Sequence, residues 1–272
     1  MMTDQAQKLR SLIERASPKM PHKARRIAFL SGKGGVGKTS LAVNVSIALS
    51  KLRKKTLLID CDLGLANVDV LLGYQSNSST DKVYTSGGDI REAVVNLPNG
   101  LWLLPGSGSV IPRQVIRNRR LEQILQVLDD KAEFIIMDGA AGIDDGVQYV
   151  ARLADEAVII STPDNTSTID AYRLIKILLE DHRHPAIRLI VNRAESMKLA
   201  RQTATGIIRA MDSFLSEKPD YLGWVPYDQI VERAGRERRP LVEKYPASDS
   251  ARAIVAIAHR LINPPPVEPE AA

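Results

Sequence analysis

Short apolar runs alternate along the chain with longer stretches that have helical periodicity. The runs of strand length are mostly continuous rather than alternating, which is typical of strands covered on both faces. We predict strands at Arg26–Ser31, Thr56–Asp60, Leu101–Leu104, Phe134–Asp138, Ala157–Ser161, Arg188–Asn192 and Tyr221–Val225.

Helical periodicity fills most of the intervals between these runs. The predicted helices are Lys38–Leu52, Asn118–Asp129, Thr166–Asp181, Lys198–Leu215 and Ser248–Leu261. Alternating strands and helices predict an α/β fold with a mostly parallel, doubly wound sheet and helices on both faces. Ligands of such sheets bind outside the carboxyl ends of the strands.

The pattern also predicts the organisation of the chain. Residues 1–24 form a polar, basic N-terminal arm, residues 25–263 form one domain, and residues 264–272 form a Pro-rich tail that we expect to be disordered.

Composition narrows the functional classes. The chain has 272 residues, of which 44% are hydrophobic and 25% charged, as in an ordinary globular protein. It has neither a long apolar run for a membrane span nor a signal peptide. The single cysteine, Cys61, fits a cytoplasmic location and leaves no cysteine pair for an iron–sulfur cluster. The net charge of +5 weakly favours anionic partners, and the 4% aromatic content provides no stacking platform for single-stranded nucleic acid.

The segment from Gly32 to Thr39 matches the phosphate-binding pattern G-x-x-x-x-G-K-[ST]. It follows a predicted strand and opens a predicted helix, as this pattern requires. Backbone amides of the loop would surround phosphate oxygens, Lys38 would bridge the β- and γ-phosphates, and Thr39 would bind Mg²⁺. The loop also contains Gly34, Gly35, Val36, Gly37 and Ser40. We therefore expect a nucleotide and Mg²⁺ as cofactors.

Two apolar strands end in aspartate, which phosphoryl transfer requires near the metal and the attacking water. Asp138 ends one, and Asp60 and Asp62 end the other. If the second strand neighbours the phosphate-loop strand, Asp60 and Asp62 face the phosphates. Thr39, Asp60 and Asp138 are then the metal candidates. The alternative is that these aspartates cap helices or turns.

The phosphate loop, with its second lysine Lys33, is similar to the deviant Walker A motif of the MinD/ParA class of ATPases. Asp60–Gly73 resembles the switch I segment of the MinD branch, and Asp138–Ile143 resembles its switch II. The resemblance covers Arg25 to Ile262 and implies an ATP-dependent homodimer that hydrolyses ATP slowly. It implies that Lys33 reaches the partner's phosphates, that Asp62 positions the hydrolytic water, and that Asp138 holds Mg²⁺ through water.

Two further segments resemble the nucleotide-base pocket of this class. Val191-Asn192-Arg193 is one, and its Asn192 would read adenine. The other contains Pro226 and Asp228, which would line the pocket.

The N-terminal arm resembles flagellar-number regulators of the FlhG/FleN type. The residues that carry this resemblance are Asp4, Gln5, Ala6, Leu9 and Arg10. The resemblance implies that the arm stimulates a signal-recognition-type GTPase, FlhF, and that flagellar switch-ring proteins or transcriptional regulators are further partners. Asp4 would cap a short amphipathic helix that orders on binding. Alternatively, the arm folds back on its own domain or stays solvated.

The expected function is an ATPase switch for flagellar number and placement, and two rivals stay open. One is a MinD-type ATPase that cycles on the anionic inner membrane through the last helix, whose stripe is Ala251, Ile254, Val255, Ala258 and Leu261. We favour packing of this stripe in the core. The other rival is a ParA-type partition ATPase, although we expect no specific nucleic-acid binding from the mixed-charge arginine clusters.

Overall fold

The computed structural model describes residues 24–62, 67–74, 82–84, 88–106, 115, 118–181, 184–212 and 219–263. The predicted N-terminal arm lies outside the described residues except for Ala24, and so does the predicted tail 264–272. The domain boundaries that the sequence predicts therefore stay predictions.

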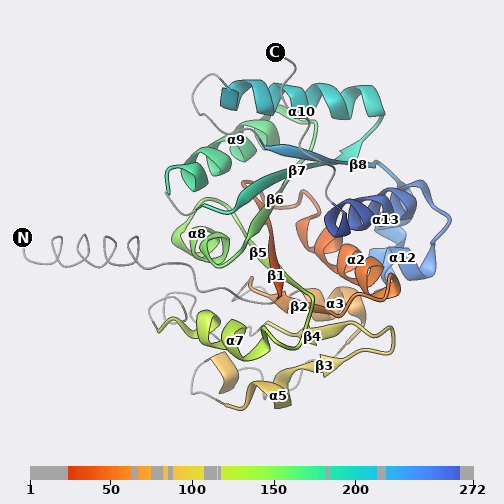
Figure 1. Cartoon of the computed structure of the whole chain (residues 1–272). Coiled ribbons are helices and arrows are strands. Elements are labelled where there is room, and N and C mark those ends of the chain that lie inside the picture. The colour runs from red at the N-terminus through yellow and green to blue at the C-terminus, as the bar shows by residue number, and fades with distance from the viewer. Residues whose placement is uncertain are drawn as a thin grey trace, which may run out of the picture.

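A central sheet forms the middle layer of the molecule (Figure 1). Among the described residues it has eight strands in the order β3-β4-β2-β5-β1-β6-β7-β8, parallel except for the β3–β4 pair. The strands are β1 Arg25–Ser31, β2 Thr56–Asp60, β3 Val95–Asn96, β4 Trp102–Leu104, β5 Phe134–Ala141, β6 Glu156–Ser161, β7 Ala186–Ala194 and β8 Asp220–Pro226.

Helices cover both faces of the sheet (Figure 1). One layer consists of α7 Arg120–Leu128, α8 Asp145–Arg152, α9 Asn165–Leu179 and α10 Met197–Asp212. The other contains α2 Lys38–Lys51, α3 Val68–Leu72, α11 Gln229–Arg236, α12 Leu241–Lys244 and α13 Asp249–Ile262. A short helix, α5 Ile90–Ala93, precedes β3. The α/β, mostly parallel, doubly wound fold predicted from the apolar runs is confirmed.

Burial explains why the strand runs are continuously apolar. Every residue of β2 and β6 is buried, and alternate side chains of β1 enter the cores on opposite sides of the sheet. Cys61 is also buried.

The last helix settles one alternative left open by its pattern. Ala251, Ile254, Ala258 and Leu261 are buried at the interface with α2 and β8. The apolar stripe of α13 is therefore a core stripe in this structure. Within the described parts of the chain, no helix is long and apolar enough to cross a membrane.

The sheet order corrects one condition of the sequence analysis. We predicted that Asp60 and Asp62 face the phosphates on the condition that their strand, β2, lies next to β1. In the structure, β5 lies between β1 and β2. Asp138 of β5 pairs in register with Phe29 of β1 on one side and with Asp60 of β2 on the other. Asp138 is thus the strand-end carboxylate next to the phosphate-loop strand.

Candidate nucleotide site

The phosphate loop connects the carboxyl end of β1 to the first turn of α2. Gly35 and Gly37 have positive φ angles of 78° and 92°, which favour glycine because it lacks a side chain. A Cβ on Gly32 would lie 2.2 Å from the carbonyl oxygen of Asp170 in α9. Glycine at these positions allows both the turn and the close approach of α9.

The inner side of the loop is open. A Cβ built on Gly34 or on Gly35 would meet nothing within 4 Å. The loop lies at the N-terminus of α2, where unpaired N–H groups and the helix dipole attract anions. A cavity of about 720 Å³ begins here, with Gly34, Lys38, Thr39, Asp62, Asp144 and Arg193 among its lining residues. Its size and donors suit a phosphate-bearing ligand.

Lys38 and Asp138 form a buried ion pair beneath the loop. Lys38 Nζ lies 2.8 Å from Asp138 Oδ1 and 3.3 Å from Thr39 Oγ1, and the two charged side chains are 6% and 1% exposed. Burial raises the pKa of Asp138, and the charge of Lys38 opposes that shift. The other carboxylate oxygen, Oδ2, is buried and has no hydrogen-bond partner among the residues that the structure describes. An acceptor of this kind beside the Thr39 hydroxyl fits the hydration shell of a Mg²⁺ ion.

Asp60 and Asp62 have different surroundings although they are two residues apart. Asp60 Oδ1 accepts the N–H of Asp62 at 3.0 Å, and Oδ2 accepts those of Asn67 and Val68 at 3.2 and 3.3 Å. Burial, and next the charge of Asp138, raise the pKa of Asp60 to about 7. Asp60 therefore holds the backbone of Asp62, Asn67 and Val68 through hydrogen bonds. It is not among the residues that line the cavity.

Asp62 is half-buried and lines the cavity. Burial raises its pKa, the nearby charge of Lys38 lowers it, and the charge of Asp144 raises it. This carboxylate is placed where it can contact a water molecule near the phosphate loop.

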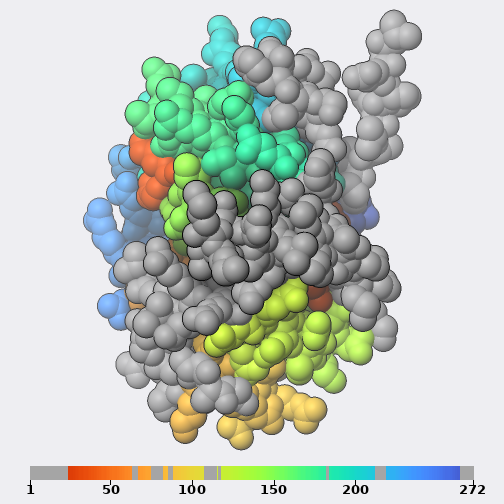
Figure 2. All heavy atoms as spheres, turned by 90° about the vertical axis from the view of Figure 1, so that its left-hand side faces the viewer, coloured from red at the N-terminus to blue at the C-terminus, as the bar shows by residue number. Residues whose placement is uncertain are grey.

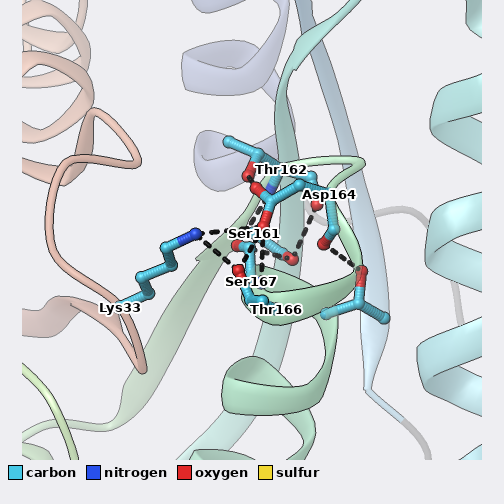
Figure 3. A network of polar contacts seen from close by, with 7 residues as sticks. Lys33, Ser161, Thr162, Asp164, Thr166 and Ser167 are labelled. Carbon is cyan, nitrogen blue, oxygen red and sulfur yellow. Dashed lines mark hydrogen bonds and ion pairs between the residues drawn. The ribbon is translucent and has the colours of Figure 1, made fainter.

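Lys33 is not among the residues that line this cavity, and its side chain points toward Thr166 and Asp164 at the start of α9 (Figure 3). Its Nζ lies 3.1 Å from Asp164 Oδ1 and 2.5 Å from Thr166 Oγ1, and its side chain is 41% exposed. Hydrogen bonds, first from Thr162 and then from Thr166, hold the pKa of Asp164 well below its usual range. In Figure 2, red-orange atoms from early in the chain lie beside the green atoms of α9, as this contact requires.

Of the four residues predicted to bind the base, Asn192 contacts the phosphate loop and Arg193 lines the cavity, whereas Pro226 and Asp228 are not among its lining residues. Asn192 donates from Nδ2 to the Val36 carbonyl at 2.7 Å, and this amide lies where a Cβ of Gly37 would be. Arg193 is exposed, has a φ of 56°, and lines the cavity. Asp228 caps α11 by accepting the N–H of Ile230, and the Pro226 carbonyl accepts the hydroxyl of Ser250. Adenine recognition by these residues stays a prediction.

Two carboxylates of the site were not singled out from the sequence. Asp144 caps α8 and lines the cavity near Asp62, and Asp164 caps α9 and binds Lys33. Each carboxylate accepts a hydrogen bond from a backbone N–H two or three residues later in the chain, which is the pattern of a helix N-cap. That pattern locates a helix start but does not indicate which other side chain the carboxylate contacts.

Comparisons with known proteins agree with this geometry. The model of the family described as "ParA: NUBPL iron-transfer P-loop NTPase" matches residues 23–262. The antiactivator FleN of Pseudomonas aeruginosa is 34% identical over 88% of this chain and 87% of its own length. The flagellum site-determining protein YlxH of Helicobacter pylori is 30% identical over 96% of this chain and 91% of its own.

Solved structures are similar as well. The septum site-determining protein MinD of Pyrococcus horikoshii, complexed with Mg-ADP, has a TM-score of 0.75 and 25% identity, and the match covers 88% of this chain and 96% of that one. The chain therefore belongs to the ParA family of P-loop NTPases, whose cofactors are ATP and Mg²⁺.

Proposed function

We propose that this chain is an ATP-dependent, dimerising ATPase switch that regulates flagellar number or placement. The observation that carries the proposal is the cavity that Lys38 and Asp62 line, with Asp138 buried against Lys38 and with Lys33 of the same loop exposed beside Asp164. The flagellar part rests on the similarity to FleN and YlxH.

The residues of the loop would bind the nucleotide and exclude bulk water from its phosphates. Loop amides and Lys38 would contact the phosphates, and Lys38 would separate from Asp138 to do so. Thr39 and Asp138 would hold the hydrated metal ion, and Asp62 would accept a hydrogen bond from the attacking water and orient it. Mg²⁺, when bound, would neutralise phosphate charge. Burial of Asp138 keeps this carboxylate in place for that contact.

Lys33 would complete the site of a second copy. It is exposed and its pair with Asp164 is solvent-accessible on both sides, at 41% and 48%. Exposed pairs of this kind contribute at most about 1 kcal/mol, so releasing Lys33 costs little. A second cation supplied in trans would stabilise charge in the transition state, an effect worth roughly 10³–10⁵ in rate in systems that use an arginine finger.

The N-terminal element would link the switch to an FlhF-type GTPase. Asp4, Gln5, Ala6, Leu9 and Arg10 lie outside the described residues, so the support is their sequence pattern. The test is the GTP hydrolysis rate of the partner with full-length protein, with the Leu9→Asp variant, and with a peptide of residues 1–20. Stimulation by the first and third, but not by the variant, supports the proposal. Equal rates with and without the full-length protein contradict it.

A MinD-type positioning ATPase is the second candidate, because MinD of Synechocystis is 35% identical over 87% of this chain. That function requires ATP-dependent membrane contact. The stripe of α13 packs against α2 and β8, so the contact would have to use other residues. Co-sedimentation with anionic liposomes in ATP and Mg²⁺, without stimulation of the GTPase, would favour this candidate over the flagellar one.

A further inference from the structure

The cavity at the phosphate loop extends into a part that the proposed mechanism does not use. The loop lies at the start of α2, which covers one face of the sheet. At the carboxyl ends of β2 and β5, the cavity is lined by Cys61 and Ala140. It then reaches Leu121 of α7 and Tyr149 and Val150 of α8, two helices that cover the other face (Figure 1). We call the part lined by Leu121, Tyr149 and Val150 the α7–α8 arm.

The described walls of the α7–α8 arm are apolar side chains, with one polar atom among them. Leu121, Val150 and the ring of Tyr149 belong to the buried core on this side of the sheet. The polar atom is the hydroxyl oxygen of Tyr149. Tyr149 is 7% exposed, and no residue that the structure describes accepts the hydrogen of its hydroxyl. A buried hydroxyl without an acceptor is unfavourable, so an acceptor that enters the cavity would stabilise it.

The first turn of α7 adds backbone donors beside this hydroxyl. Burial, and next the charge of Glu122, raise the pKa of Tyr149, whereas the backbone N–H of Glu122 and the charge of Arg119 lower it. This N–H therefore faces the hydroxyl. The residue before α7, Arg119, has a φ of 51°, and its side chain does not cap the helix. Because N–H groups at a helix start attract anions, the Tyr149 hydroxyl and the start of α7 form a point where a small anion can bind.

ATP hydrolysis in this cavity would leave a phosphate anion with limited routes to solvent. The phosphate loop and the bound Mg·ADP would lie on one side of the phosphate. In the proposed dimer, the second copy would cover the side from which its Lys33 enters. The α7–α8 arm leads away from both, past Asp62, which would orient the attacking water.

We propose that the α7–α8 arm is the path by which inorganic phosphate leaves the closed dimer, and that the Tyr149 hydroxyl and the first turn of α7 bind the phosphate on this path. The inference rests on the proposed function, because phosphate forms here only if the chain hydrolyses ATP. Tyr149 and α7 take no part in the hydrolysis itself.

The charges of the cavity fit release rather than storage of the phosphate. Asp62 and Asp144 line the cavity, and their carboxylates repel a phosphate dianion. A phosphate that carries two protons is a monoanion, and its hydroxyls can donate to these carboxylates. In the α7–α8 arm, the apolar walls offer few hydrogen bonds, so the phosphate is bound there weakly enough to leave.

The first test does not depend on hydrolysis. Inorganic phosphate is titrated into the full-length protein saturated with Mg·ADP, and calorimetry measures its affinity. We expect Tyr149→Phe to weaken phosphate binding by about tenfold and to leave ADP affinity unchanged, as for the loss of one hydrogen bond to an anion. Tyr221→Phe is the matched control, because the Tyr221 hydroxyl is also buried without a described partner but Tyr221 does not line the cavity. Equal phosphate affinities of Tyr149→Phe and the parent protein, or no phosphate binding by the parent, overturn the proposal.

The second test separates cleavage from release in a single turnover of Mg·ATP. Chemical quenching measures cleavage, and a fluorescent phosphate-binding protein measures free phosphate. We expect Leu121→Phe, which narrows the α7–α8 arm, to leave cleavage unchanged and to make release lag behind it. The matched control is Leu125→Phe, because Leu125 is also buried in α7 but does not line the cavity.

The outcomes of this second test are distinct. Release that keeps pace with cleavage in Leu121→Phe overturns the proposed path, and so does an equal lag in both variants. Absence of cleavage in the parent protein instead contradicts the proposed function, and the phosphate titration then still decides whether Tyr149 binds phosphate.

Discussion

The ion pair between Lys38 and Asp138 is the residue-scale feature that the nucleotide site depends on most. It is nearly fully buried, so replacing one partner leaves a buried charge without compensation, which typically costs about 3–5 kcal/mol. We expect Lys38→Met to lower the free energy of unfolding by about that amount in urea titrations. Lys38→Met/Asp138→Asn should recover most of the loss. The control is Lys54→Met, which removes an exposed ion pair with Glu133. A Lys38→Met variant that loses no more free energy of unfolding than this control would contradict the prediction.

Asp60 predicts a pH dependence of stability. Its pKa is raised from 3.8 to about 7 in the folded protein, so folding favours its protonated form. The contribution of protonated Asp60 to the free energy of unfolding is complete below about pH 4 and is lost as the pH rises toward 7. The free energy of unfolding then falls by at most about 1.4 kcal/mol per pH unit. We expect Asp60→Asn to be less stable at pH 5 but to lose less stability between pH 5 and pH 8. The measurement is urea unfolding of both proteins at each pH, and parallel curves would contradict the assignment.

At the scale of elements, the packing of the phosphate loop against α9 depends on Gly32. A Cβ there would lie 2.2 Å from the backbone of Asp170, which cannot move without shifting α9. We expect Gly32→Ala to destabilise the protein by about 1–3 kcal/mol, as overpacked sites do. Gly34→Ala is the matched control, because nothing lies within 4 Å of its Cβ, and it should affect nucleotide affinity rather than stability. Thermal unfolding compares the two, and equal melting temperatures would contradict the prediction.

The contact between Lys33 and the N-terminus of α9 holds this lysine on its own subunit. Asp164→Asn removes the charge that attracts Lys33 and keeps an oxygen to accept the N–H of Ser167. If dimerisation requires Lys33 to leave, this variant should dimerise at a lower ATP concentration, by up to about fivefold for an exposed pair of about 1 kcal/mol. Sedimentation over an ATP series measures the shift. A variant that needs more ATP than the parent protein would contradict it.

Elements also show what the sequence could and could not predict. Continuous apolar runs located the main strands because these are buried on both faces, and glycine spacing located the phosphate loop. Helix α8 was not predicted. It is short, and its buried residues, which are Val147, Tyr149, Val150 and Ala151, do not repeat over enough turns to give a clear helical period. The place of β5 between β1 and β2 was not predictable either, because periodicity carries no information on strand order. The Lys33–Asp164 contact joins residues far apart in the chain, and only the fold brings them together.

At the scale of the whole molecule, we propose that the protein is a switch with two states. In this structure Lys38 is paired with Asp138 and Lys33 with Asp164, so both lysines contact carboxylates of their own chain. Nucleotide binding would separate Lys38 from Asp138, and Lys33 would then leave Asp164 and contact the nucleotide of a second copy. The central claim is that dimerisation requires nucleotide binding and requires Lys33.

One measurement tests this claim most directly: sedimentation velocity with ATP and Mg²⁺ in the Asp62→Ala background, which should slow hydrolysis. The account predicts a dimer for Asp62→Ala and for the control Asp62→Ala/Lys54→Ala, since Lys54 has a similar exposed ion pair far from the loop. It predicts a monomer for Asp62→Ala/Lys33→Ala that still binds nucleotide. An ATP-dependent dimer that persists without Lys33 would contradict the account.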